Sequence, residues 1–360
     1  MKKYTLFYCT LLTTLLSYSQ NKFVNQKVFL ITLDGLRWQE LFSGADSLLV
    51  INKNYVKNPE KLLEWSWNEK QKIRRKMLMP FIWNDVVNMG QIYGNRNLQN
   101  KVNLTNRMWF SYPGYNEILT GRSDDENIFS NDKIPNKNET ILEQFSKAFN
   151  SSKVGAFASW DVFDYIINQE RSGVYTNCGF ESSTDFPLNK KELLLNDLQS
   201  QIPSPWGSVR FDGFTHQYAK IFLDKNKPDF IFISYGETDD FAHDGDYESY
   251  LKSCKNSDNL IKDLWEYTQK SDYYRGKTTF IITTDHGRGT EPIESWKSHG
   301  ADIKGSDQTW IILFGKGISA KGEISEPNQL YSNQIAPTIQ ELIGIPRKYA
   351  SGYGIPLILR

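Results

Sequence analysis

Residues 229–246, "DFIFISYGETDDFAHDGD", pass from a run of aromatic and β-branched side chains into a turn with several acids and one histidine. A nearly continuous apolar run of this length predicts a strand buried on both faces, as in a parallel sheet. Asp239 comes where the strand ends, and His243 follows it by four residues. Carboxylate and imidazole groups bind divalent metals, so this stretch predicts both a fold class and a site.

The rest of the chain repeats this pattern of apolar strands separated by helices. Helical patterns cover residues 213–225 and 250–269. Strands that alternate with helices predict an α/β fold with a largely parallel central sheet flanked by helices. Two stretches interrupt the alternation, near residues 43–80 and 160–212, and we expect them to be inserted cap segments over the edge of the sheet. The other predicted strands are residues 27–34, 278–287 and 309–317.

Chemically active side chains cluster at the predicted strand ends. In parallel sheets the reactive groups collect at the carboxyl ends of the strands. Three aspartates and three of the four histidines lie there, which is enough for two metal ions with three side chains each and leaves positions open for substrate. The fourth, His216, lies in a helical pattern and is expected to be a packing residue. The six candidate ligands are Asp34, Asp239, His243, Asp285, His286 and His299.

A serine in "FSYPGYNEILTGR", residues 110–122, is the candidate nucleophile. Ser111 stands just before a helical pattern, which is the usual place of an N-cap. The same place presents backbone N–H groups to an anion, and a metal ion can hold the hydroxyl as an alkoxide. The two interpretations are compatible, and both stay open at this point.

Composition and the N-terminus bear on location and partners. The 360 residues include 42 Lys+Arg and 42 Asp+Glu, so no global charge attracts a nucleic acid duplex or an anionic membrane. Residues 1–19 have two lysines, an apolar stretch and small residues near Ser19, which predicts an export signal rather than a membrane anchor. We expect residues 20–360 to be one hydrolase domain, periplasmic or secreted, without stable membrane insertion after cleavage. Pairing of Cys178 with Cys254 stays open.

Five motifs in this order resemble the alkaline phosphatase superfamily, most closely its type I phosphodiesterase and nucleotide pyrophosphatase branch. They are "LDGLRWQ", "SYPGYNEILTG", "DDFAHDG", "TTDHG" and "SHG", spread over residues 33–300. The resemblance implies one zinc ion on Asp239, His243 and His299 and a second on Asp34, Asp285 and His286, with Ser111 between them; Mn²⁺ suits the same ligands.

The resemblance also implies a reaction and substrate contacts. Ser111 attacks phosphorus in line, and water hydrolyses the resulting phospho-enzyme. Asn131 lies at nearly the spacing of an asparagine that binds a phosphoryl oxygen in that branch. Tyr115 and Trp160 are further candidates for contact with a small phosphate ester substrate.

Differences from the family motifs determine which alternative functions have to be considered. Some monoesterases of the superfamily carry Lys and Arg two residues apart after the next strand, whereas this chain has Ser159, Trp160 and Asp161 there, which favours phosphodiesters or nucleotide pyrophosphates over phosphomonoesters. Against a sulfatase, Tyr115 stands where that signature needs Arg, and Gly35 replaces a second Asp. A non-catalytic binding protein would lack a ligand, and none is missing. A phosphoglycerate mutase conflicts with the export signal.

Overall fold

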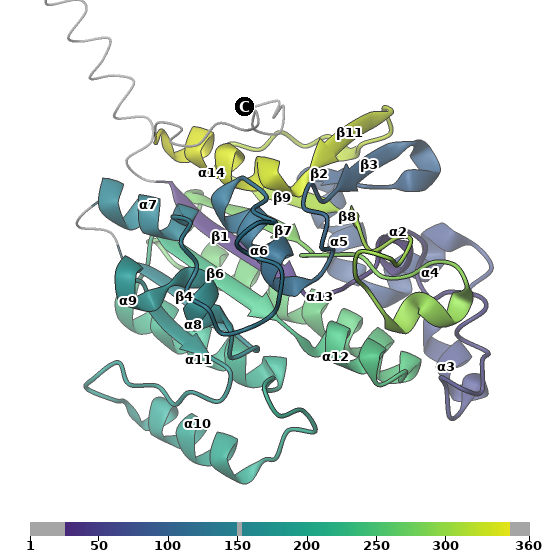
Figure 1. Cartoon of the computed structure of the whole chain (residues 1–360), viewed down its shortest axis with the longest axis horizontal. Helices are drawn as coiled ribbons and strands as arrows, with labels where there is room; N and C mark the ends of the chain where they lie inside the picture. The colour runs from purple at the N-terminus through teal and green to yellow at the C-terminus, as the bar shows by residue number, and fades with distance from the viewer. Residues whose placement is uncertain (1–25, 150–152, 346–360) are drawn as a thin grey trace, which may run out of the picture.

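The computed structural model describes residues 26–149 and 153–345, and the predicted signal at residues 1–19 lies outside them. The chain forms an eight-stranded sheet with helices on both faces (Figure 1). Its strands run in the order β10-β2-β9-β7-β1-β6-β4-β5. The strands of this sheet are β1 (Lys27–Leu33), β2 (Gly90–Tyr93), β4 (Val154–Ala158), β5 (Tyr175–Cys178), β6 (Phe230–Tyr235), β7 (Thr278–Thr283), β9 (Ile311–Gly315) and β10 (Gly322–Glu323).

The sheet is largely parallel, as predicted. β1 pairs in parallel with both β6 and β7, and β4 pairs in parallel with β6 and β5. β9 runs antiparallel to its two neighbours, β7 and β2. The carboxyl ends of β1, β6 and β7 therefore meet at one edge, where the predicted ligands follow them. A second sheet contains β3 (Asn100–Asn103), β8 (Gln308–Thr309) and β11 (Asn328–Tyr331).

Alternate side chains of β1 enter two separate cores. Phe29, Ile31 and Leu33 belong to one buried cluster, whereas Val28 and Leu30 belong to the other. This two-sided burial explains why the strands read as continuous apolar runs. The first cluster includes side chains of α2 (Trp38–Ser43), α3 (Pro59–Ser66), α4 (Gln71–Leu78), α5 (Pro80–Asn84), α11 (Asp212–Asn226), α12 (Glu237–His243) and α13 (Tyr247–Lys270). The second includes side chains of α6 (Ser111–Thr120), α7 (Ile141–Ala148), α8 (Phe163–Ile167) and α14 (Ile335–Ile343).

The two expected insertions differ in how they join the domain. Residues 43–80 form short helices whose side chains belong to the first buried cluster. Residues 160–212 contain α9 (Gln169–Ser172), α10 (Lys190–Gln201) and also β5, which is the edge strand of the central sheet. The helices α8 and α9 precede β5, and α10 follows it; Figure 1 shows α10 at the lower margin beyond α11.

The described residues also bear on the predictions for the membrane, the cysteines and His216. Within the described residues, no helix has the length and apolarity needed to cross a membrane. Cys178 and Cys254 are both buried and free. His216 is buried beside Tyr235 and Asp263, away from the other histidines, which agrees with a packing role.

Candidate active site

The six predicted ligands lie together at the carboxyl edge of the sheet. Asp34 follows β1, Asp285 and His286 follow β7, and Asp239 and His243 lie on α12 directly after β6. His299 comes from the loop after the short 3₁₀ helix Ile293–Lys297. The parallel register of three neighbouring strands thus brings together ligands that are far apart in the sequence.

One cluster is fully buried. Nε2 of His286 lies 3.4 Å from Oδ1 of Asp34 and 3.4 Å from Oδ2 of Asp285. Two atoms bound to one tetrahedral zinc ion are about 3.3 Å apart. Both of these carboxylate oxygens are buried without a hydrogen-bond partner, which is costly for a carboxylate unless a cation lies between them. The donor set therefore fits a divalent ion.

The tautomer of His286 supports this role. Its Nδ1 lies 2.9 Å from the carbonyl oxygen of Gly287, which can only accept a hydrogen bond, so Nδ1 carries the proton. Nε2 is then free to bind a metal ion, and a backbone partner on the second nitrogen is the usual arrangement for metal-binding histidines.

A second cluster is open to solvent. Nε2 of His243 lies 3.1 Å from Oδ2 of Asp239 and 3.0 Å from Nε2 of His299. The side chain of His243 is 45% exposed, whereas that of His286 is completely buried. Substrate therefore has access from the His243 side of the site.

Charge in the buried cluster favours a bound cation. Burial and Asp239 raise the pKa of Asp34, and burial and Asp34 raise the pKa of Asp285 well above its ordinary value. Burial alone would lower the pKa of His286, but Asp285, Asp34 and Asp239 raise it to about 9. A bound cation would oppose these upward shifts of the carboxylate pKa values, so metal binding and proton binding compete at this cluster.

The pKa of Asp239 shifts in the opposite direction from those of Asp34 and Asp285. Burial would raise its pKa, but Arg288, His243 and His299 lower the pKa well below the usual range. Burial and the charge of His286 also lower the pKa of His299 well below its ordinary value. The second cluster therefore presents an ionised carboxylate beside a neutral imidazole, which is the form that binds metal.

Ser111 is the first residue of α6, and its hydroxyl faces the buried cluster. Its Oγ lies 3.3 Å from Nε2 of His286. The N-cap position is Phe110, and it has no side-chain cap, so Ser111 does not serve as the N-cap. Two residues earlier, Trp109 has a φ of 53°, a backbone conformation that non-glycine residues seldom adopt.

The helix start offers fewer amides to an anion than the sequence suggested. Tyr112 N donates to Oδ1 of Asn131 at 2.9 Å, and Gly114 N donates to the carbonyl of Phe110. Pro113 has no N–H. A bound anion at this helix end therefore depends on side chains, and the amide of Asn131 lies at the start of the helix.

Gly114 allows α6 to pack closely against the end of β7. A Cβ at this position would lie 2.3 Å from the carbonyl oxygen of Asp285. α6 thus packs directly on the backbone of a predicted ligand, and a larger side chain would not fit here without moving that strand end.

Tyr115 lies behind the site. Its side chain is fully buried, and its hydroxyl donates to Oδ2 of Asp34 at 2.7 Å while accepting from Ser234 at 3.0 Å. This geometry argues against the expected substrate contact and makes Tyr115 an outer partner of a metal ligand.

The three residues directly after β4 are engaged in contacts of their own. Trp160 is partly buried and packs edge-on against Phe163, with ring centroids 6.2 Å apart. Oδ2 of Asp161 accepts from Lys133 at 2.8 Å, and Ser159 donates to Asp212. This region therefore presents a neutralised ion pair and an indole rather than free cations.

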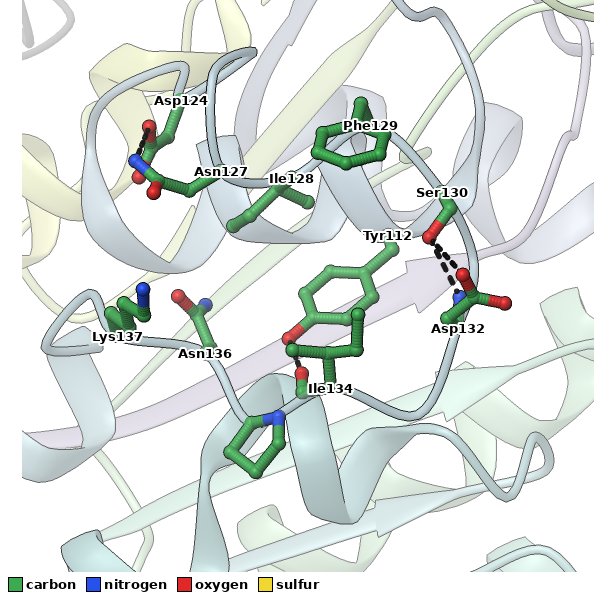
Figure 2. Close-up of a pocket in the computed structure, with 11 residues that line it drawn as sticks. Tyr112, Asp124, Asn127, Ile128, Phe129, Ser130, Asp132, Ile134, Asn136 and Lys137 are labelled. Atoms are coloured by element: carbon green, nitrogen blue, oxygen red, sulfur yellow. Dashed lines mark hydrogen bonds between the residues drawn. The ribbon is translucent and has the colours of Figure 1, made fainter.

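A cavity of about 70 Å³ lies beside Tyr112. Figure 2 shows the hydroxyl of Tyr112 pointing to the carbonyl of Ile134, with Ile128 and Phe129 on the opposite side. The loop that carries Asn131 thus closes around the residue that follows Ser111.

Arg288 was missed in the sequence. It is buried two residues after His286, and its Nη1 donates to Oδ1 of Asp239. The sequence offered one signal for Arg288: it lies between Gly287 and Gly289, just after the predicted ligands Asp285 and His286.

Comparison with known proteins agrees with this geometry. A family model described as "Metalloenzyme superfamily" matches residues 192–345. A 2,3-bisphosphoglycerate-independent phosphoglycerate mutase of Campylobacter jejuni is 32% identical over 140 residues, 37% of this chain and 27% of the mutase. Human GPI ethanolamine phosphate transferase 1 is 29% identical over 134 residues, 32% of this chain and 14% of the transferase. The chain thus spans about a quarter or less of these relatives.

Solved structures share the fold at low identity. The alkaline phosphatase PafA superposes with a TM-score of 0.58 at 13% identity, covering 92% of this chain and 99% of PafA. The phosphonate monoester hydrolase SpPMH from Silicibacter pomeroyi has a TM-score of 0.56 at 12% identity, covering 92% of this chain and 76% of that one. The phosphodiesterase branch stays a prediction. Residues 192–345 thus match the metalloenzyme superfamily model, and the fold as a whole is similar to that of the alkaline phosphatase PafA.

Proposed function

We propose that this protein is an exported two-metal phosphoric ester hydrolase that acts through Ser111, with phosphodiesters or nucleotide pyrophosphates as its substrates. The observation that carries the proposal is the position of Ser111 Oγ, 3.3 Å from Nε2 of His286, beside two sets of carboxylate and imidazole groups. A hydroxyl nucleophile needs such a setting, because it is weak at its ordinary pKa.

Divalent ions held by the six ligands would lower the pKa of the serine hydroxyl and balance charge on the phosphoryl group. The assignment of the ions follows the family resemblance: Asp34, Asp285 and His286 would hold one, and Asp239, His243 and His299 the other. His286 lies close to both sets, since it also groups with Asp239 and His299. Zinc suits these nitrogen and oxygen ligands, and Mn²⁺ suits them as well.

The chain's own residues position the reaction. Ser111 Oγ loses its proton to solvent and forms a bond to phosphorus, while the bond from phosphorus to the leaving oxygen breaks on the opposite side. The leaving oxygen departs toward the exposed side, at His243, where it takes up a proton from solvent. In the second step the oxygen of a water molecule forms a bond to phosphorus, the bond from phosphorus to Ser111 Oγ breaks, and Oγ takes up the proton that the water loses.

Asn131 supports the phosphoryl group. Its Oδ1 accepts from Tyr112 N, which leaves the Nδ2 donors of the same amide available for a phosphoryl oxygen. Such donors are most effective where charge develops in the transition state.

The preference for a diester rests on local charge. A monoester dianion carries one more negative charge than a diester and needs an additional cation. The residues after β4 supply Asp161, whose partner Lys133 is already paired with it. The proposed export rests on residues 1–19 of the sequence.

The test is a comparison of matched aryl phosphodiester, phosphomonoester and sulfate ester substrates with zinc-loaded mature protein. We expect the diester to have the highest kcat/KM, with Ser111→Ala as the blank. A faster monoester would contradict the diester assignment, and a faster sulfate ester would contradict the phosphoric ester class.

A further inference from the structure

Arg288 is a buried guanidinium directly behind the open metal cluster. Its side chain is fully buried, although it carries a permanent charge. Nη1 donates to Oδ1 of Asp239, Nη2 donates to the carbonyl of Lys297, and Nε donates to the carbonyl of Trp296 at 2.8 Å. All three nitrogens are therefore engaged, and a buried charge paired in this way is costly to disturb.

These contacts join two parts of the site that come from different regions of the chain. Asp239 lies on α12 after β6, whereas the two carbonyls come just before His299. Trp296 is completely buried and packs edge-on against Tyr247, with ring centroids 5.2 Å apart. Arg288 thus links Asp239 to a loop that is itself anchored in the core.

His299 needs such an anchor. A metal-binding histidine usually donates its second ring N–H to a fixed acceptor. Nδ1 of His299 is buried and has no hydrogen-bond partner in the described residues. The orientation of its ring therefore depends on the backbone before it, which Arg288 holds at two carbonyls.

The orientation of Asp239 also depends on Arg288. Oδ1 accepts from Arg288, and Oδ2 faces Nε2 of His243 at 3.1 Å. Gly35 makes room for this pair, since a Cβ there would lie 2.5 Å from Oδ1 of Asp239 and 2.8 Å from Nη1 of Arg288. Gly289, next to Arg288, also has no room for a side chain, since a Cβ there would lie 2.3 Å from the carbonyl oxygen of Ser295.

We propose that Arg288 is a positioning residue for one of the two metal ions, the one held by Asp239, His243 and His299, a role that rests on the proposed function. It fixes one carboxylate oxygen of Asp239 and the approach of His299, so that the remaining ligand atoms converge. Its nitrogens contact neither Asp34 nor Asp285, so the buried site should assemble without it.

The test is zinc content and affinity of the purified full-length protein, measured by elemental analysis and by titration with a chromophoric chelator. Arg288→Met should reduce zinc from about two ions per chain to about one, because loss of an outer partner costs about 10- to 100-fold in metal affinity. Arg288→Lys keeps a charge without the planar fork, and should weaken the same single site by a smaller factor.

Arg75→Met is the matched control. Arg75 is also buried and forms a two-point ion pair with Glu323 of β10, at the edge of the central sheet. It should retain two ions, even if the protein loses stability. If Arg288→Met does not fold, Arg288→Lys alone decides the question.

Three results would overturn the inference. Unchanged affinity at both sites in the Arg288 variants would refute it while leaving the proposed hydrolase intact, as judged by wild-type turnover. Equal loss of both ions would show that Arg288 supports the whole site and not one metal. Wild-type protein with fewer than two ions and no turnover would remove the proposed function as well.

Discussion

The hydroxyl oxygen of Ser111 lies 3.3 Å from Nε2 of His286, at the closed end of the site and not at the exposed His243–His299 end. The proposed nucleophile therefore lies with the buried cluster of Asp34 and Asp285. We place the proposed leaving group at the open cluster, where the side chain of His243 is 45% exposed. The buried end and the open end of the site therefore have different expected roles.

Ser111→Ala should abolish turnover while leaving the zinc content at the wild-type level. The reason is that the hydroxyl is the attacking group, whereas six other side chains hold the ions. Rate and zinc content are measured on the same preparation. Ser130→Ala, which removes a hydroxyl that donates to Asp132 in the neighbouring loop, is the control and should keep full activity.

Asn131→Ala should lower kcat/KM by roughly 100-fold, the usual effect of removing one donor to a transition-state oxyanion. Steady-state kinetics on an aryl phosphodiester measure it. Asn127 lies four residues earlier in the chain and lines the cavity beside Tyr112, and its amide donates to Asp124, so Asn127→Ala should have little effect. Equal losses in the two variants would indicate that Asn131 acts only by holding the loop.

Tyr115→Phe should weaken zinc binding at the buried site by about 10- to 100-fold, because Asp34 loses the donor that orients it. Tyr112→Phe removes a hydroxyl that donates to the carbonyl of Ile134 and should leave zinc affinity unchanged. Chelator competition separates the two. An unaffected Tyr115→Phe variant would show that Asp34 is oriented without it.

Asp258→Asn should flatten the pH dependence of stability between about pH 4 and pH 7. Burial raises the pKa of Asp258 to about 7, although Phe81 N and Ile82 N donate to it and lower the pKa. The folded state holds this proton where the unfolded chain has lost it, so the free energy of unfolding falls as pH rises through this window.

Thermal unfolding from pH 4 to 8 in the presence of chelator measures this slope without the metal contribution. Asp272→Asn is the control, because its side chain is 91% exposed. It should follow the wild-type slope. If Asp258→Asn also follows the wild-type slope, the raised pKa assigned to Asp258 is wrong.

The sheet could be predicted from the sequence, and the candidate ligands could be selected, because both have local signals. The apolar runs that end in Asp34, Asp239 and Asp285 gave the strands and their active edge. The histidines were few enough that three in turns at one edge were informative.

Other features had no local signal. The burial of Tyr115 depends on how α6 packs against β1 and β6, and the motif only placed it near the nucleophile. β5 is short and lies inside a polar stretch, so its pairing with β4 could not be recognised. The three contacts of Arg288 depend on the path of residues 287–299, which contains no regular periodicity.

Detection of a covalent seryl intermediate is the measurement that tests the central claim most directly. Zinc-loaded protein is mixed with a methyl aryl phosphodiester, quenched in acid within the first turnovers, and analysed by intact mass and peptide mapping. The account predicts a methylphosphoryl group on Ser111, released aryl alcohol in equal amount, and no adduct on Ser111→Ala. Steady turnover with an unmodified Ser111, or an adduct on another residue, would contradict it.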